Sequence, residues 1–466
     1  MVQIILQNNP ADPQVGLRMK KHFPYLWQLM DKLCICVPKV TNRLRYVLDL
    51  VLREQLGLDF IITTNLSEFE SFEGPCLIYG DKADGKHLFF KANHLLFERE
   101  ISSQELKAFD REGVKAIFPV FDKNAALDFD VFAAVFYLVS RYEEYLPYVR
   151  DQHGRFEAGS SVLHKLKMLQ TPLVNLWCIE LGKLLMEKFP GLTIKNKKYQ
   201  FIPTYDVDAA WAYMHKGLFR TSGAYLRDLY KFDMDEVKLR TKVLRGRCKD
   251  PFDTFGLQLA MQKEFRLQPV YFILFASYGL NDKNIPTRNR YFRNLIKQLG
   301  DYADIGIHPS YASFSDKKIL QQEVESLSKV LNRQITQSRQ HFLRMSLPST
   351  YLNLINRDIE HDYTMGYAQQ PGFRAGIADS FRFYDLDHDV PTSLRIHPFT
   401  IMDGTLCDYL QLSPQEAVDQ IKSLIRTVKN VNGTFISLWH NESLSDQKRW
   451  SGWVQVYKEL VTEAVA

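Results

Sequence analysis

The sequence predicts an α/β fold, with a larger C-terminal domain built on parallel strands and a smaller N-terminal α/β domain. Helix-like and strand-like segments alternate through the second half of the chain, which is typical of strands that pair in parallel. The run 269–275 is continuously apolar, as in a strand that is buried on both faces. At 466 residues the chain is also long for one domain. We therefore expect domains at 1–195 and 196–466, divided at the polar stretch 195–198.

In the N-terminal domain the pattern indicates alternating strands and helices. Residues 1–6 are typical of a first strand, and further strand-like runs lie at 60–64, at 76–79 and within 114–121. Apolar residues with helical spacing follow Asp130, a suitable N-cap, and predict a helix that extends to about residue 145. A second helix is expected at 172–188.

In the C-terminal domain, helices at 252–266, 288–300, 316–332, 349–357 and 414–430 alternate with strand-like runs. Several of these runs end in an ionisable residue. The order fits either a closed barrel or a doubly wound sheet. In both architectures functional residues gather at the carboxyl ends of the strands.

Composition excludes several classes of protein. The 59 basic and 54 acidic residues leave a net charge of only +5, which does not indicate nucleic-acid binding but is compatible with mild attraction to anionic substrates. No run of 18 apolar residues predicts a transmembrane segment, and the start lacks the basic and apolar regions of a secretory signal. The six cysteines do not follow a zinc-binding spacing. We expect a cytoplasmic protein with free thiols.

Two carboxylates mark the end of the first strand of the C-terminal domain. Asp206 and Asp208 follow the strand-like run that begins at Phe201. Side chains two residues apart on a strand point the same way, so both carboxylates would face one spot. One of them would bind a cation, and the other would accept or donate a proton. The alternative is an ordinary pair of surface aspartates in a turn.

Further ionisable side chains end the later strands: His308, Arg339, His341 and His440. Each taken alone has an ordinary alternative, such as a loop histidine or a hydrogen-bonded core histidine. Their joint occurrence at strand ends points to a metal-dependent hydrolase. Imidazole and carboxylate ligands with one open position activate a water molecule on a divalent cation.

The order of these motifs resembles the NodB-homology polysaccharide deacetylases of carbohydrate esterase family 4. The resemblance rests on Thr204-Tyr205-Asp206, Gly306-Ile307-His308-Pro309-Ser310, Arg339 and Leu438-Trp439-His440, and spans about residues 199–445. It implies a distorted (β/α)7 barrel and removal of acetyl groups from sugars. Residues 128–180 resemble the N-terminal domain found in a divergent bacterial branch of these proteins, for which no activity is implied.

The resemblance implies a metal site and shows where this chain departs from the family. Asp206 matches the catalytic base, and Asp208 and His308 match two metal ligands. The family's aspartates are usually adjacent, whereas one residue separates them here. The usual second metal histidine would stand four residues after His308, where this chain has Ala312. We expect His341 to replace it as a ligand of the metal, with zinc as the expected ion.

The other catalytic roles come from the resemblance as well. Arg339 matches the arginine that orients the base, and His440 matches the catalytic acid. Asp362 matches the aspartate that tunes this histidine. Arg374 and the aromatic residues Tyr311 and Trp439 are expected to contact the substrate, and His397 and Asp403 are further candidates to line the cleft.

These observations predict a metal-dependent carbohydrate deacetylase whose substrate is an acetylated sugar or glycan precursor. Two alternatives remain open at this point. One is a metal-dependent hydrolase of a C–N bond outside sugars, and the other is a catalytically silent glycan-binding protein. The sequence leaves the sugar, the choice between N- and O-acetyl groups, and the oligomeric state open.

Overall fold

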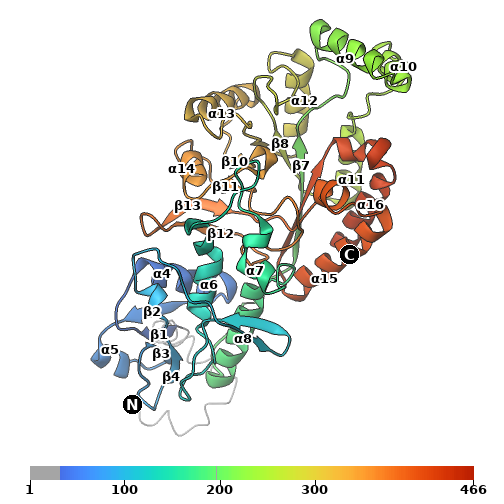
Figure 1. The fold of residues 1–466 in the computed structure, drawn as a ribbon. Helices are drawn as coiled ribbons and strands as arrows, with labels where there is room; N and C mark the ends of the chain where they lie inside the picture. Colours follow the sequence, from blue (N-terminus) through green and yellow to red (C-terminus); the bar gives the residue numbers. More distant parts are fainter. Residues whose placement is uncertain (1–31, 196) are drawn as a thin grey trace, which may run out of the picture. The chain divides into compact units, whose positions relative to one another are not determined.

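The fold is described by a computed structural model, which covers residues 32–195 and 197–466 (Figure 1). The strand expected at residues 1–6 lies outside the described residues. By its internal contacts the chain forms two compact units. The first comprises the described residues of Met1–Tyr137 and Val174–Lys197, and the second comprises Leu138–Leu173 and Lys198–Ala466. Among the described helices, none has an apolar stretch long enough to cross a membrane.

The division differs from the expected single boundary at residue 195, because residues 138–173 belong to the second unit. The reason is a buried ion network. The Arg374 guanidinium donates to the Glu144 carboxylate at 2.6 Å, and Glu144 also accepts from Arg141 at 2.7 Å. All three side chains are buried. Charges without water need such partners, so these contacts hold the segment against the second unit.

The first unit contains a parallel sheet with the strand order β2-β1-β3-β4. Its strands are β1 (Leu33–Cys36), β2 (Phe60–Thr63), β3 (Cys76–Gly80) and β4 (Leu88–Lys91), with an antiparallel hairpin of β5 (Ala108–Arg111) and β6 (Val114–Ile117). Its helices include α4 (Asn42–Leu48), which continues into the π-helical turn η1 (Asp49–Gln55), α5 (Leu66–Glu70) and α8 (Leu173–Lys188). The strands expected at 60–64 and 76–79 are confirmed. All six cysteines are free, and four of them are buried.

Helix α6 (Val131–Val139) confirms the expected N-cap but ends earlier than expected. The Asp130 carboxylate accepts hydrogen bonds from the backbone N–H groups of Phe132 and Ala133 at 3.0 Å each. The helix stops because Arg141 adopts a left-handed backbone conformation with φ 55°. A 3-10 turn, η3 (Tyr142–Tyr145), follows and carries Glu144 into the ion network.

The second unit is built on a nine-stranded sheet with the order β12-β13-β11-β10-β9-β8-β7-β15-β14. The strands are β7 (Gln200–Val207), β8 (Val270–Ile273), β9 (Asp304–Ile307), β10 (Gln337–Ser338), β11 (His361–Asp362), β12 (Phe381–Asp385), β13 (Val390–Ile396), β14 (Ile401–Met402) and β15 (Thr434–His440). Neighbouring strands are parallel except for the hairpin of β12 and β13, which sequence analysis did not predict.

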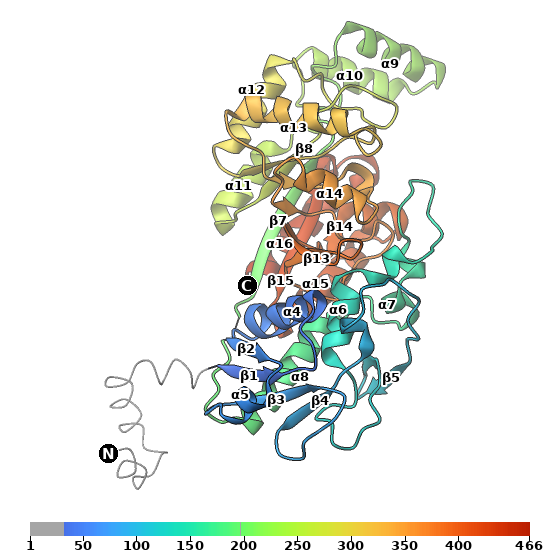
Figure 2. The ribbon, with the colours of Figure 1, turned by 90° about the vertical axis from the view of Figure 1, so that its left-hand side faces the viewer.

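Helices pack around this sheet in the order that the sequence predicted. They are α7 (Val162–Lys165), α9 (Leu218–Tyr230), α10 (Met234–Leu244), α11 (Phe255–Phe265), α12 (Arg290–Gly300), α13 (Lys317–Leu331), α14 (Ser349–Ile355), α15 (Pro414–Asn430) and α16 (Trp453–Val465). Helices α7, α9, α10 and α16 were not predicted. Figures 1 and 2 show α9 and α10 as a hairpin at the far end of this unit from β12.

Parallel register brings the carboxyl ends of the central strands to one edge. Asp206 pairs with His440 on one side and with Phe272 on the other. Phe272 pairs in turn with Gly306, where a Cβ would meet the Phe272 ring at 2.6 Å, so only glycine fits there. This close packing of β8 and β9 sets the position from which His308 leaves the sheet.

Candidate active site

The predicted strand-end residues meet in one cavity of about 300 Å³ in the second unit. Its lining includes both aspartates and three of the expected histidines: Asp206, Asp208, His308, His341 and His440. Arg155, Tyr409, Glu442 and Arg449 also line this cavity and were not anticipated. The structure therefore brings these five strand-end residues together in one cavity.

Asp208, His308 and His341 form the closest cluster of ligand-type atoms. The His308 Nε2 atom lies 3.2 Å from Asp208 Oδ1, and the His341 Nε2 atom lies 3.5 Å from Asp208 Oδ2. One ligand atom from each residue lies within 4.8 Å of the others. Asp208 Oδ1 is buried and has no hydrogen-bond partner among the described residues. An unsatisfied buried carboxylate oxygen between two imidazoles is suited to a cation.

The His308 ring is oriented by the backbone. Its Nδ1 lies 2.5 Å from the carbonyl oxygen of Arg339, which only accepts, so Nδ1 carries the proton. Nε2 of the neutral ring is then a free lone pair that faces Asp208. A histidine whose second nitrogen is held in this way is the usual form of a metal ligand.

His341 is held in the same manner, but by a carboxylate. Its Nδ1 lies 2.9 Å from Asp282 Oδ1, and its Nε2 faces Asp208. Burial disfavours the charged imidazole, but the charges and hydrogen bonds of Asp208 and Asp282 outweigh it and raise the pKa of His341 to about 9. The same pair of histidines holds the pKa of Asp208 well below its usual range against the opposing effect of burial.

The route by which His341 reaches the site differs from the one expected. The prediction placed Arg339 and His341 among the side chains that end a strand. In the structure β10 ends at Ser338, and a 3-10 turn, η5 (His341–Leu343), carries the imidazole inward. Phe342 within this turn has φ 59°. The position of His341 therefore depends on this turn rather than on strand alternation.

Asp206 is held by the arginine that the resemblance indicated. Arg339 is fully buried, and its Nη1 donates to Asp206 Oδ1 at 2.9 Å and to the Thr204 hydroxyl at 2.7 Å. Its Nε donates to the carbonyl of Tyr363 at 2.9 Å, which fixes the plane of the guanidinium. The second carboxylate oxygen, Oδ2, lies 3.7 Å from His308 Nε2 and remains on the cavity side.

His440 is paired with Asp403 and not with Asp362. His440 Nδ1 lies 2.8 Å from Asp403 Oδ1, and the His440 backbone N–H donates to Asp403 Oδ2 at 2.7 Å. Burial disfavours the charged ring, but Asp403 in particular, with Asp208 and Asp206, raises the pKa of His440 well above its usual value. Asp362 is fully buried and accepts from the hydroxyls of Ser338 and Thr364, so the predicted tuning role of Asp362 is wrong.

The expected substrate contacts are not found at the cavity. Arg374 is buried in the network with Glu144 and also donates to the Gly366 carbonyl at 2.9 Å. Trp439 is fully buried and packs on Tyr457, because the alternation of β15 turns its side chain away from that of His440. Tyr311 packs edge-on against Phe342 and is absent from the cavity lining.

Two residues that complete the site were not assigned their roles from sequence. Asp282, which orients His341, stands seven residues beyond the apolar run that ends at Phe275. Its place shortly after a predicted strand is the sequence signal that could have indicated it. Asp403 was expected only as a residue near the cleft. It follows β14, whose pairing with β15 is what brings it to His440. His397 packs against His361 and Tyr363 and does not line the cavity.

Comparison with known proteins finds one family model and several solved structures. A model described as "Family of unknown function (DUF7033)" matches residues 33–190. No curated protein matches the chain. Solved structures are similar at low identity. A putative polysaccharide deacetylase from Mycobacterium smegmatis has 15% identity and a TM-score of 0.38, with 57% of this chain and 85% of that chain covered.

Two other solved structures show a similar level of likeness. PuuE allantoinase has 10% identity and a TM-score of 0.34, with 56% of this chain and 83% of that chain covered. A CE4 family pseudoenzyme from Bacillus anthracis has 13% identity and a TM-score of 0.24, with 57% of this chain and 61% of that chain covered. At these scores the similarities carry no argument about activity, which has to come from the side chains of this protein.

Proposed function

We propose that this protein is a metal-dependent deacetylase that removes an acetyl group from an acetylated sugar. The observation that carries the proposal is the cluster of Asp208, His308 and His341, with ligand atoms within 4.8 Å of one another. Both imidazoles are anchored through Nδ1, so both Nε2 atoms point to the proposed cation position, and a cation would take the place of the Nε2 proton of His341. The motif order that resembles the carbohydrate esterases supports acetylated sugars as the substrate class.

A divalent cation fits these three residues. The unsatisfied Asp208 oxygen and the two oriented imidazoles make the three-ligand set of a catalytic site that keeps a position open. We propose zinc, because nitrogen and carboxylate ligands suit it. When bound, such a cation supplies Lewis acidity toward water and toward an acetyl carbonyl.

Asp206 is the proposed base. Arg339 holds one of its oxygens, Oδ1, and the other oxygen lies on the cavity side beside His308. From this position Asp206 accepts a proton from the water that attacks the acetyl carbonyl carbon. The ion pair with Arg339 keeps the carboxylate in a single orientation, so little reorganisation accompanies the transfer.

His440 is the proposed acid. Asp403 accepts the Nδ1 proton and stabilises the charged ring, so that Nε2 also carries a proton. Nε2 lies 4.0 Å from Asp208 Oδ2, and His440 pairs with Asp206, the proposed base, on the neighbouring strand. As the bond between the acetyl carbon and the sugar nitrogen breaks, His440 donates its Nε2 proton to the departing amine, and acetate is the second product.

We further propose that the parallel strands close as a distorted (β/α)7 barrel. The segment 390–402 adjoins both ends of the parallel series, because Ile396 pairs with Asp362 of β11 and Ile401 pairs with Ser437 of β15. Such closure would explain why residues from β7, β9, β10 and β15 face a common cavity. The cytoplasmic location and the identity of the glycan precursor stay predictions.

Two measurements on the purified chain test the proposed function. We expect about one divalent cation per chain by elemental analysis, acetate release from N-acetylated sugars, and no ring opening of cyclic amides. Asp208→Asn serves as the matched variant and should lose both properties. Turnover of cyclic amides alone would indicate a different C–N hydrolase. A protein that binds sugars without holding metal or releasing acetate would contradict the proposal.

A further inference from the structure

A second and larger cavity in the same unit is unusually basic. The segment 209–250 contains ten Lys and Arg residues and five Asp and Glu residues, a net charge of +5 that equals the net charge of the whole chain. Helices α9 and α10 lie in this segment and form one side of a cavity of about 600 Å³. Four of the ten cations of this segment line the cavity: Lys216, Arg220, Arg227 and Arg240.

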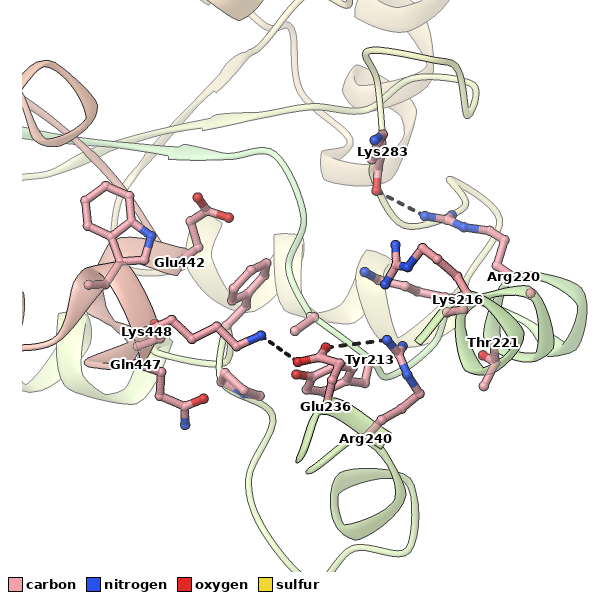
Figure 3. Close-up of a pocket in the computed structure, with 18 of the residues that line it drawn as sticks. Tyr213, Lys216, Arg220, Thr221, Glu236, Arg240, Lys283, Glu442, Gln447 and Lys448 are labelled. Carbon is pink, nitrogen blue, oxygen red and sulfur yellow. Dashed lines mark hydrogen bonds and ion pairs between the residues drawn. The ribbon is translucent and has the colours of Figure 1, made fainter. Parts of the chain in front are cut away.

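The cations of the cavity come from several elements and face a common space. Figure 3 shows Lys216 and Arg220 on one side and Lys448 on the opposite side, with Arg240 and Glu236 between them. Arg240 and Lys448 are already paired with the Glu236 carboxylate. Lys216, Arg220 and Lys283 have no carboxylate partner among the described residues, and Arg220 donates only to the carbonyls of Lys283 and Asn284.

Among these cations, Lys216 has a lowered pKa. Its side chain is half-buried, and burial together with the neighbouring Arg220 lowers the pKa of Lys216 to about 8. Gathering cations that are not paired with a carboxylate in a partly enclosed space is unfavourable. A bound anion would remove that cost.

This cavity adjoins the catalytic cavity. Glu442, Arg449 and Trp450 line both, and Arg449 and Glu442 form an ion pair at 2.7 Å. An extended ligand whose acetylated end lies near Asp206 would thus place its other end among Lys216, Arg220 and Lys283. The chemistry of those three side chains suits a phosphate or diphosphate ester.

We propose that this basic cavity binds the phosphate or diphosphate group of the substrate, so that the protein acts on a phosphorylated acetylated sugar. The substrate assignment rests on the proposed deacetylase function, whereas the anion site does not. Both a soluble sugar nucleotide and a sugar linked to a lipid through diphosphate carry such a phosphate or diphosphate group.

The first test measures binding of inorganic diphosphate to the metal-loaded protein by calorimetry. The double variant Lys216→Gln/Arg220→Gln should weaken binding by on the order of 100-fold, because two charge-assisted contacts are lost. Lys317→Gln/Lys318→Gln, two exposed lysines outside both cavities, should bind normally. Equal affinity in the Lys216 and Arg220 variant, as expected if diphosphate only contacts the metal, would overturn the anion site.

Kinetics then separate this site from the proposed function. With a diphosphate-linked acetylated sugar, the double variant should raise KM by about 10-fold or more and leave kcat within about twofold. With the unphosphorylated sugar it should change neither. If the wild type releases no acetate from any sugar but still binds diphosphate through Lys216 and Arg220, the function fails and the anion site stands. An equal KM effect on both sugars overturns the assignment of a phosphorylated substrate.

Helix α9 carries a second and independent feature, an apolar face that is open to solvent. Leu218, Phe219, Leu226 and Tyr230 are each at least 70% exposed. Their spacing puts them on one side of the helix, opposite Arg220, Ala224 and Arg227, which line the basic cavity. Helices normally bury such a face, and contiguous exposed apolar side chains mark an interaction surface.

We infer that this face of α9 docks on an anionic lipid surface. The exposed apolar side chains, together with exposed lysines that lie outside the cavity lining, namely Lys231, Lys238 and Lys242, are the two attractions that hold an interfacial helix.

Co-sedimentation with vesicles tests the lipid surface. The protein should bind vesicles that contain about a third phosphatidylglycerol, bind phosphatidylcholine vesicles poorly, and dissociate as salt is raised. Leu218→Ser/Phe219→Ser should reduce binding about 10-fold or more, whereas Phe121→Ser/Tyr302→Ser, which changes two exposed apolar residues elsewhere, should not. If the wild type is a dimer, the Leu218 and Phe219 variant is monomeric and neither binds vesicles, a second copy covers the face and the inference is wrong.

Discussion

Two pairs of histidines in the second unit have nearly the same ring separation and opposite chemical character. The rings of His308 and His341 lie 5.0 Å apart, and those of His361 and His397 lie 5.1 Å apart. In each pair the two histidines lie in, or shortly after, neighbouring strands of the same sheet. Ring proximity alone therefore does not distinguish a candidate metal site from ordinary packing.

The difference lies in what holds the nitrogens. In the pair of His361 and His397 the rings hydrogen-bond to each other at 2.9 Å, and burial, with the nearby His361 and Arg395, lowers the pKa of His397 to about 3. In the other pair both Nδ1 atoms are held by oxygen acceptors, and both Nε2 atoms face Asp208. The comparison teaches that external acceptors at Nδ1, with a carboxylate at Nε2, are the features that suit histidines to a metal.

The largest expected effect separates the two aspartates beside the first pair. Asp206→Asn should lower kcat by about 100- to 10,000-fold and retain the metal, because an amide does not accept the proton of water. Asp208→Asn should lose both metal and turnover. Elemental analysis with acetate-release kinetics checks both variants. Equal loss of metal in the two would show that the division of roles between them is wrong.

A smaller effect is expected when the carboxylate that holds one histidine of the first pair is removed. Asp282→Asn removes the carboxylate that holds His341 Nδ1. Metal affinity should fall by about 10- to 100-fold, which is the usual range for a group that orients a ligand. Competition titration with a zinc chelator measures this change. Asp385→Asn, which alters a carboxylate that contacts His388 elsewhere, should leave the affinity unchanged.

The smallest expected effect is a displacement of the pH profile. Asp403 raises the pKa of His440, and the proposed acid acts in its protonated form, so activity is present below this pKa and lost as pH rises through it. Asp403→Asn removes the carboxylate charge, so the basic limb of kcat should move to lower pH. An unmoved limb, or one displaced to higher pH, would remove His440 from the role of acid.

The strand-end argument predicted the core of the site from sequence because parallel strands place their carboxyl ends at one edge. Asp206, Asp208, His308 and His440 needed no further information. Asp362 was misassigned because residue order does not reveal that the segment after β13 returns beside β15. It is this return that brings Asp403, rather than Asp362, to the histidine of the last strand.

Long-range pairing explains the other errors. Arg374 was expected at the substrate, but its partner Glu144 stands 230 residues earlier in the chain, beyond the reach of local patterns. The helix after Asp130 was extended too far for a related reason. Its apolar spacing continues past residue 139, and the buried ion network ends it by taking Arg141 out of the helical conformation.

The central claim is that His341 supplies the third metal ligand in place of the histidine that the family resemblance expects where this chain has Ala312. Zinc titration of metal-free wild type, His341→Ala and His361→Ala, with circular dichroism as the folding control, tests it most directly. We predict that His341→Ala weakens zinc binding by on the order of 100-fold or more, beyond the roughly 10- to 100-fold effect of an orienting residue. His361→Ala should bind zinc as wild type does. A folded His341→Ala variant with unchanged zinc affinity would contradict the account.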